Sequence, residues 1–131
     1  MRRIVPNIYS NDLEKSKDFY IDFLDMELAM DMGWVLTFVS KENPTAQISI
    51  FQNKDNSPLD NSAIFLSIEV SHIEAYYKKA MQQKIAIEYP ITNEDWGVRR
   101  FFIKDPNGVT INLLSHLEWS FIGHSKVQKA F

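Results

Sequence analysis

The sequence predicts an α+β fold in which two βαβββ modules pair to form curved mixed sheets. The first observation is an internal repeat: residues 33–38 (GWVLTF) are echoed by 96–101 (WGVRRF), and 48–50 (ISI) by 111–113 (INL). The second is that strand and helix patterns follow the same order in both halves. Half of 131 residues is also too small to bury a convincing core alone, so the halves must share one structure.

The first half begins with a β-branched stretch at residues 3–9, which predicts a strand. A helix should follow, with Asn11 as its N-cap and Glu14 three residues later, in the manner of a capping box. Apolar and small side chains then recur at helical spacing, which predicts a buried helix face. This face comprises Leu13, Ser16, Tyr20, Phe23 and Leu24. Residues 27–53 read as three strands with breaks at 31–33 and 42–45.

The second half repeats this plan after a linker at 54–62 that is rich in Asn, Asp, Ser and Pro. We expect a strand at 63–70, a helix capped by Ser71 and Glu74, and three strands at 85–89, 98–104 and 109–115. The apolar face of the second helix comprises Ile73, Tyr76, Tyr77 and Ala80. Residues 105–108 (DPNG) predict a tight turn.

These elements predict one domain over residues 1–131, with module 1 at about 3–53 and module 2 at about 63–116. The segment 117–131 is expected to be an extension that docks on the protein, either within one chain or across a dimer.

Composition narrows the classes of partner and of chemistry. The net charge of −3 comes without a long run of like charge, so we expect neither nucleic acid nor a membrane as a partner. The absence of cysteine excludes thiolate metal sites, a cysteine nucleophile and disulfide bonds. No apolar run has the length of a signal peptide or a membrane span, so a cytoplasmic location is the default expectation.

Strand alternation separates two faces of the predicted sheets. One face is aliphatic and should pack under the helices; it comprises Ile4, Ile8, Ile48, Ile50, Ile64, Leu66, Ile68, Ile111 and Leu113. The other mixes apolar and neutral polar side chains and comprises Val5, Asn7, Gln47, Ser49, Phe51, Phe65, Ser67, Thr110, Asn112 and Leu114. Such a mixture is typical of a ligand-facing surface, although the solvated face of an antiparallel sheet is an alternative.

Two stretches carry a resemblance to a known family. Residues 8–13 (IYSNDL), followed by Phe19 and Tyr20, and residues 96–108 (WGVRRFFIKDPNG) resemble the vicinal oxygen chelate superfamily. This superfamily includes glyoxalase I, extradiol dioxygenases and the fosfomycin- and bleomycin-resistance proteins. The likeness covers about residues 3–115 and is closest to the bleomycin-resistance branch. It implies paired βαβββ modules, a cleft enclosed by each curved sheet, and a homodimer.

The resemblance also implies where a metal would be held, because catalytic members bind a divalent cation with four side chains, mostly His, Glu or Gln. The matching positions here are Val5, Ser49, Phe65 and Asn112. Two of these have no lone pair to offer, and the neighbouring positions on the same face add no histidine and no carboxylate. We therefore predict no metal, no cofactor and no catalytic residue at this seam.

The three histidines, His72, His116 and His124, do not suggest another metal or catalytic site. No two of them have the spacing of paired ligands on a helix, and none has an evident acidic group to orient it. His72 is expected at the surface, beside the start of the second helix.

The remaining features indicate binding. Trp34 and Trp96 occupy corresponding places in the repeat, near the start of the third strand of each module, and indoles offer rigid surfaces to flat ligands. Resistance-type relatives are similar in holding planar antibiotics with aromatic side chains. Packing at a sheet edge or a dimer interface is the alternative. Arg99 matches the arginine of the family run and either pairs with an acid or holds an anionic or planar ligand.

We therefore predict a metal-independent small-molecule binding protein of the glyoxalase/bleomycin-resistance type that sequesters an aromatic compound or antibiotic and forms a homodimer. The predicted ligand-binding residues are Val5, Asn7, Trp34, Gln47, Ser49, Phe51, Phe65, Ser67, Trp96, Arg99 and Asn112.

Three alternatives stay open on the sequence alone. One is a metal-dependent lyase or dioxygenase-like enzyme with a relocated metal site. Another is a cofactorless enzyme that uses Tyr9 or Glu69 as a base. The third is a degenerate module kept for dimerisation, with its cleft plugged by Phe51 and Phe65. The sequence leaves open the identity of the ligand, whether any reaction occurs, and whether the modules pair within one chain or between chains.

Overall fold

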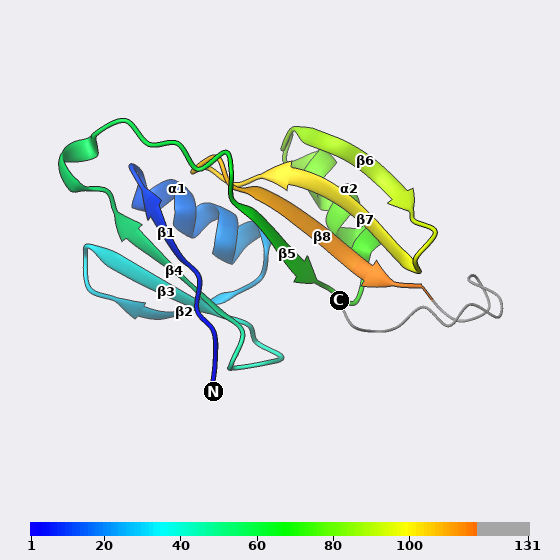
Figure 1. The fold of residues 1–131 in the computed structure, drawn as a ribbon, viewed down its shortest axis with the longest axis horizontal. Helices are drawn as coiled ribbons and strands as arrows, with labels where there is room; N and C mark the ends of the chain where they lie inside the picture. The colour runs from blue at the N-terminus through cyan, green and yellow to red at the C-terminus, as the bar shows by residue number, and fades with distance from the viewer. Residues whose placement is uncertain (118–131) are drawn as a thin grey trace. The chain divides into compact units, whose positions relative to one another are not determined.

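A computed structural model describes residues 1–117, and it divides into two compact units (Figure 1). Unit 1 contains residues 1–63 together with 105–109, and unit 2 contains residues 64–104 and, within the described chain, 110–117. Each unit is described by itself below. In the described part of the chain, no helix is long and apolar enough to cross a membrane.

Unit 1 contains a mixed four-stranded sheet. Its strand order is β1-β4-β3-β2, with bounds of Asn7–Ser10, Gln47–Gln52, Val35–Val39 and Glu27–Asp31 in that order. β1 runs parallel to β4, whereas β3 is antiparallel to both of its neighbours. The three strands predicted between residues 27 and 53 are confirmed.

Unit 2 repeats this arrangement, with the strand order β5-β8-β7-β6. The strands are β5 (Phe65–Glu69), β8 (Thr110–His116), β7 (Val98–Lys104) and β6 (Ile87–Asn93), and the helix α2 (Ile73–Gln82) lies against this sheet (Figure 1). The edge strand β5 again runs parallel to its neighbour β8. The predicted α+β fold of repeated βαβββ modules is therefore confirmed.

The first strand is shorter than predicted and begins at Asn7 instead of residue 3. Ile4 makes only an isolated bridge to Ala46 and is 69% exposed, so the prediction that it packs under the helices is wrong. Pro6 lies between Ile4 and β1, and it has no N–H to donate to a strand ladder. Val5 accordingly lies ahead of the strand and is half-buried.

The first helix has its N-cap one residue later than predicted. The Asp12 carboxylate accepts a hydrogen bond from the Lys15 N–H at 3.0 Å, and α1 spans Leu13–Lys17. The Asn11 side chain instead donates to a backbone carbonyl in the linker. A carboxylate at the N-cap also complements the partial positive charge of the helix N-terminus, which favours Asp12 over Asn11.

A π-helix, η1 (Asp18–Phe23), continues directly from α1. Its wider turn is visible where the Leu24 N–H donates to the Phe19 carbonyl, five residues back, at 3.0 Å. The predicted buried face is confirmed for Ser16, Tyr20, Phe23 and Leu24, and the π-turn adds Phe19 to it.

The start of α2 contradicts the predicted capping box of Ser71 and Glu74. The N-cap is His72, and its side chain makes no capping hydrogen bond. Because the helix begins at Ile73, Ser71 lies one residue too early for the geometry of the box. His72 is exposed, as predicted. On the apolar helix face, Ile73 and Ala80 are buried while Tyr76 and Tyr77 are half-buried.

β6 begins at Ile87 and extends to Asn93, later than the predicted 85–89. Its pairing with β7 has two register shifts. Pro90 is tolerated within β6 because this is an edge strand, where its missing N–H breaks no ladder. The predicted linker contains a short 3-10 turn, η2 (Lys54–Asn56), and the predicted extension lies outside the described residues except for Leu117.

The helix-facing side of each sheet forms the core of its own unit. Ile8, Ile48, Ile50, Ile111 and Leu113 are buried as alternation predicts, whereas Ile64, Leu66 and Ile68 are half-buried. Burying one such side chain stabilises the fold by about 1.5–3 kcal/mol. Aromatic rings complete this core; among them Phe38 stacks on Tyr20 with centroids 5.3 Å apart.

Candidate functional site

The predicted ligand face of unit 1 forms a polar row across three strands. Asn7 pairs with Ser49, and Ser49 pairs with Thr37 on β3. The hydroxyls of Thr37 and Ser49 lie 2.8 Å apart and are buried, so one of them donates a hydrogen bond to the other. Gln47 accepts from Arg3 at the edge of the same face. The row itself consists of neutral polar side chains, with the Arg3 guanidinium at its edge.

Aromatic side chains extend this face of unit 1. The Phe51 ring has the Tyr9 ring centroid at 6.3 Å and that of Trp34 at 5.8 Å. Tyr9 and Trp34 are both more than half exposed. The structure thus brings Trp34 and Phe51 together beside Asn7 and Ser49, while Val5 lies outside the strand.

The predicted ligand face of unit 2 is centred on Asn112. Asn112 pairs with Ser67 on one side and with Phe102 on the other. Its amide nitrogen donates to the Ser67 hydroxyl at 3.0 Å. The amide oxygen is buried and has no hydrogen-bond partner within residues 1–117, and the residue as a whole is only 5% exposed. A buried polar atom without a partner costs about 1–3 kcal/mol, so this oxygen is a vacant acceptor.

Three aromatic rings run across this face of unit 2. Phe102 lies between Phe65, at 5.1 Å, and Tyr89, at 4.7 Å between centroids. Phe65 is 53% exposed despite its size. The rings therefore border Asn112 with a continuous apolar surface that is open to solvent at Phe65.

Arg100, which is not among the predicted ligand-binding residues, lies on the same face. Its guanidinium carbon lies 5.0 Å from the Trp96 ring centroid, 4.8 Å from that of Phe102 and 5.6 Å from that of Tyr89. Its Nε donates to Glu94 Oε2 at 2.7 Å. These contacts fix a planar cation among aromatic faces, where cation–π attraction is strongest.

Arg99, the arginine predicted to bind ligand, lies on the opposite side of the sheet. Its Nε is 2.9 Å from Glu74 Oε1 on α2, off the line of a proper hydrogen bond, and its Nη1 donates to Asn93 at 2.7 Å. The structure therefore does not bring Arg99 together with Asn112. A signal for this was present in the sequence, because Arg99 shares its strand parity with Phe101 and Ile103, both of which are buried.

The prediction that no acidic group orients a histidine is wrong for His116. His116 Nδ1 lies 3.1 Å from Glu69 Oε2. Glu69 ends β5 and His116 ends the parallel neighbour β8, so the pair depends on sheet register that the sequence does not specify.

The donor set does not fit a metal. In unit 1, Val5 has no donor atom and the Ser49 hydroxyl is engaged by Thr37. In unit 2, Phe65 has no donor atom, which leaves only the amide oxygen of Asn112. Among residues 1–117, no group of three or more His, Asp or Glu side chains is placed to hold a metal ion.

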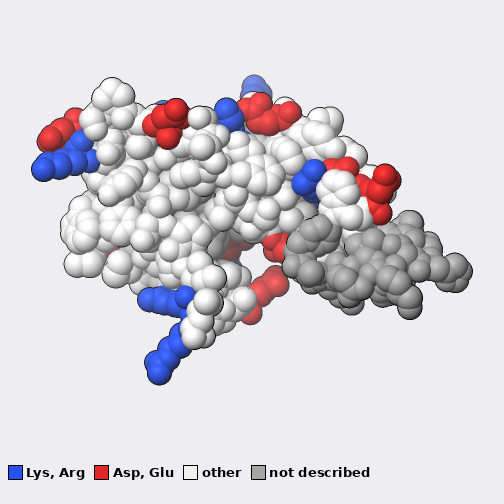
Figure 2. All heavy atoms as spheres, viewed as in Figure 1, with Lys and Arg blue, Asp and Glu red and all other residues white. Residues whose placement is uncertain are grey.

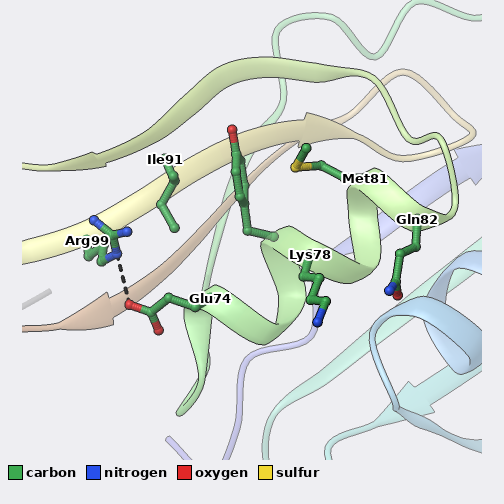
Figure 3. A pocket seen from close by; sticks show the side chains of 7 residues that line it. Glu74, Lys78, Met81, Gln82, Ile91 and Arg99 are labelled. Carbon is green, nitrogen blue, oxygen red and sulfur yellow. Dashed lines mark ion pairs between the residues drawn. The ribbon is translucent and has the colours of Figure 1, made fainter.

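A hollow of about 420 Å³ lies elsewhere in unit 2, on the helix side of its sheet (Figure 3). Its lining comprises Glu74, Tyr77, Lys78, Met81, Gln82, Ile91 and Arg99. Of the predicted ligand-binding residues, it includes only Arg99.

The space-filling view shows mostly uncharged surface, with charged groups of both signs in small clusters (Figure 2).

Comparison with solved structures supports the fold. A glyoxalase/bleomycin resistance protein/dioxygenase superfamily member from Sphaerobacter thermophilus is 23% identical, with a TM-score of 0.72 over 88% of this chain and 98% of that one. A glyoxalase/bleomycin resistance protein/dioxygenase from Nocardioides is 18% identical, with a TM-score of 0.72 over 98% and 88%. Lactoylglutathione lyase from Agrobacterium tumefaciens is 15% identical, with a TM-score of 0.68 over 86% and 91%.

No curated protein matches the sequence. The sequence pattern of a single family, in contrast, matches residues 3–113, which span both βαβββ modules. With this match the chain belongs to the Glyoxalase/Bleomycin resistance protein/Dioxygenase superfamily.

Proposed function

We propose that the protein binds a planar aromatic small molecule without a metal ion, on the face of unit 2 that carries Asn112. The observation that carries this proposal is the vacant amide oxygen of Asn112 beside a row of aromatic rings and an oriented guanidinium. A flat ligand with a hydrogen-bond donor at its edge would satisfy all three features.

Stacking would supply most of the affinity. Phe65 is 53% exposed, so a ring laid against it would remove apolar surface from water. Trp96 is 38% exposed and offers a second aromatic surface on the far side of Arg100. Because both side chains are held by their neighbours, little conformational entropy would be lost on binding.

Hydrogen bonds would orient the ligand. Arg100 has five N–H donors, and within the described chain only Nε has a hydrogen-bond partner. The remaining donors suit a carbonyl, carboxylate or phenolate on the ligand. The Asn112 oxygen accepts instead, so it suits an N–H or O–H group. We infer a ligand class of planar aromatic compounds that carry both an acceptor and a donor, a description that includes aromatic antibiotics.

Isothermal titration against planar antibiotics and simple hydroxy- and amino-aromatic acids tests this proposal. The titrations are run with a chelator and again with added Zn²⁺, Ni²⁺, Mn²⁺ or Fe²⁺. We expect saturable binding that is unchanged by the chelator, and about tenfold weaker binding in Asn112→Leu. Binding that requires a metal, or no binding across the whole panel, would contradict it.

The homodimer is part of the same proposal. It is supported by membership of the superfamily and by the large exposed aromatic side chains on both units. Sedimentation equilibrium should give twice the chain mass of 15.3 kDa. A protein that stays monomeric at all concentrations would contradict the proposed homodimer, and the proposal of ligand binding would be unaffected.

A second candidate is a cofactorless enzyme that transfers protons, and the contact between Glu69 and His116 favours it. A carboxylate beside Nδ1 can orient an imidazole as a base. Ligands that bind should then exchange acidic C–H protons for deuterium in D₂O, and His116→Gln should abolish the exchange while retaining binding. Bound ligand that never exchanges would rule this candidate out.

A further inference from the structure

The hollow on the helix side of unit 2 is separate from the proposed aromatic site. Five of its lining residues come from α2 and recur at helical spacing, and Ile91 of β6 and Arg99 of β7 complete the lining (Figure 3). These five residues are Glu74, Tyr77, Lys78, Met81 and Gln82. Its volume of about 420 Å³ lies within the range of small-molecule sites.

The hollow arises from how α2 is seated. Ile73 and Ala80 are buried, so the helix packs closely through these two positions. The adjacent helix face stands over the edge strand β6, and Met81 on that face is 59% exposed. Tyr77 forms an inner wall, since its ring contacts Phe101 edge-on at 4.9 Å. The hollow therefore has an apolar lining that the fold leaves uncovered.

Positive charge lies at one end and along the helix side of the hollow. Arg99 lies there, paired with Glu74 at 2.9 Å (Figure 3). Its Nη1 also donates a hydrogen bond to Asn93 at 2.7 Å. Lys78, one helical turn beyond Glu74, has no ion-pair partner among the described residues. Two cations and one anion leave the lining with one net positive charge.

We propose that this hollow is a second ligand site, for an apolar monocarboxylate such as a medium-chain or arylalkyl acid. The carboxylate lies at Lys78, because Arg99 is already paired with Glu74. The added negative charge neutralises the lining. The apolar body lies along Tyr77, Ile91 and Met81, and it covers the exposed methionine. This site is independent of the aromatic face on the other side of the same sheet.

The test uses ¹⁵N-labelled full-length protein titrated with octanoate, octanol and octylammonium. We expect octanoate to shift the amide signals of residues 77–82 and of Ile91 and Arg99 in a saturable manner. Octanol and octylammonium should bind at least about fivefold more weakly because they lack the anionic group.

Variants separate this site from its surroundings. Lys78→Gln should weaken octanoate binding about two- to fivefold, the effect of one exposed charge pair, and leave octanol binding unchanged. Met81→Asp should abolish octanoate binding. Lys79→Gln is the matched control, because Lys79 lies over the Tyr76 ring and outside the lining, and it should bind octanoate like the wild type.

Three outcomes would overturn the proposal: no shift on α2, equal binding of octanoate and octanol, or loss of binding in Lys79→Gln equal to that in Lys78→Gln. Asn112→Leu should leave octanoate binding intact. A parallel loss in that variant would place octanoate on the aromatic face and also refute the second site.

Discussion

The hydroxyl of Tyr20 donates a hydrogen bond to Asp105 Oδ2 across 2.6 Å within unit 1, and both residues are buried. The contact joins the π-helix η1 to the turn at 105–108, far along the chain. The other carboxylate oxygen of Asp105 accepts from the N–H groups of Asn107 and Val109 at 2.8 and 2.9 Å. The turn is therefore held from both sides by one buried carboxylate.

Replacing Tyr20 by Phe should destabilise the protein by about 2 kcal/mol, because a hydrogen bond to a buried acceptor is lost while the ring is retained. Urea denaturation measures the change. Tyr9→Phe is the control: Tyr9 is exposed, and its loss of a hydroxyl should cost less than about 0.5 kcal/mol. Equal stability of the two variants would contradict this account of the contact.

The same contact predicts a loss of stability at high pH. Burial, and then the adjacent Asp105, raises the pKa of Tyr20 well above its ordinary value of 10.0. At a pH below 10.0 the phenol is protonated in both the folded and the unfolded chain, and the contribution of its hydrogen bond to folding stability is fully present. Above it the unfolded chain releases a proton that the folded chain retains, so stability falls by up to about 1.4 kcal/mol per pH unit. Urea curves of wild type and Tyr20→Phe should therefore stay apart below about pH 10 and approach each other as the pH rises above it; parallel curves would contradict this.

Asn112 should affect binding much more than stability. Asn112→Leu removes the buried amide oxygen that has no partner, and it also removes the hydrogen bond to Ser67. Because Ser67 is exposed and its hydroxyl can bond water instead, we expect stability within about 1 kcal/mol of that of the wild type. Binding of a planar ligand should nevertheless weaken, because the acceptor is gone. Thermal unfolding and titration on the same sample measure both. A large loss of stability together with the loss of binding would indicate a purely structural role.

The two neighbouring arginines should differ sharply when each is replaced by lysine. Arg100→Lys loses the planar group that lies over three rings, and we expect about 1 kcal/mol of destabilisation and weaker ligand binding. Arg99→Lys alters a pair with Glu74, which is largely exposed, and should change stability by less than about 0.5 kcal/mol. Denaturation and titration of both variants test this, and equal effects would contradict the assignment of faces.

Much of the fold could be predicted because its signals are local. Alternation identified the buried parity of Ile50 and Ile111, and helical spacing identified Tyr20 and Phe23. Helix caps were placed one residue early in both halves, because Asn11 and Ser71 match the preferred residue types but not the actual turn of the backbone.

The candidate site was only partly predictable. Asn112 and Phe65 follow from strand parity, but Arg100 was passed over in favour of Arg99, the residue that matches the family run. The contact of Glu69 with His116 depends on the register of β5 against β8. The hollow depends on how far α2 covers the edge strand β6. These features arise from tertiary packing, which no local pattern encodes.

The tryptophans can report which unit binds the planar ligand. Trp34 lies by Phe51 in unit 1, and Trp96 lies by Arg100 in unit 2. Trp119, outside the described residues, is replaced by Phe in all variants so that two emitters remain. If unit 2 binds as proposed, Trp34→Phe should retain ligand quenching and Trp96→Phe should lose it. The reverse pattern would assign the ligand to unit 1, where the polar row of Asn7 and Ser49 would then have to supply the hydrogen bonds that Asn112 and Arg100 are proposed to make.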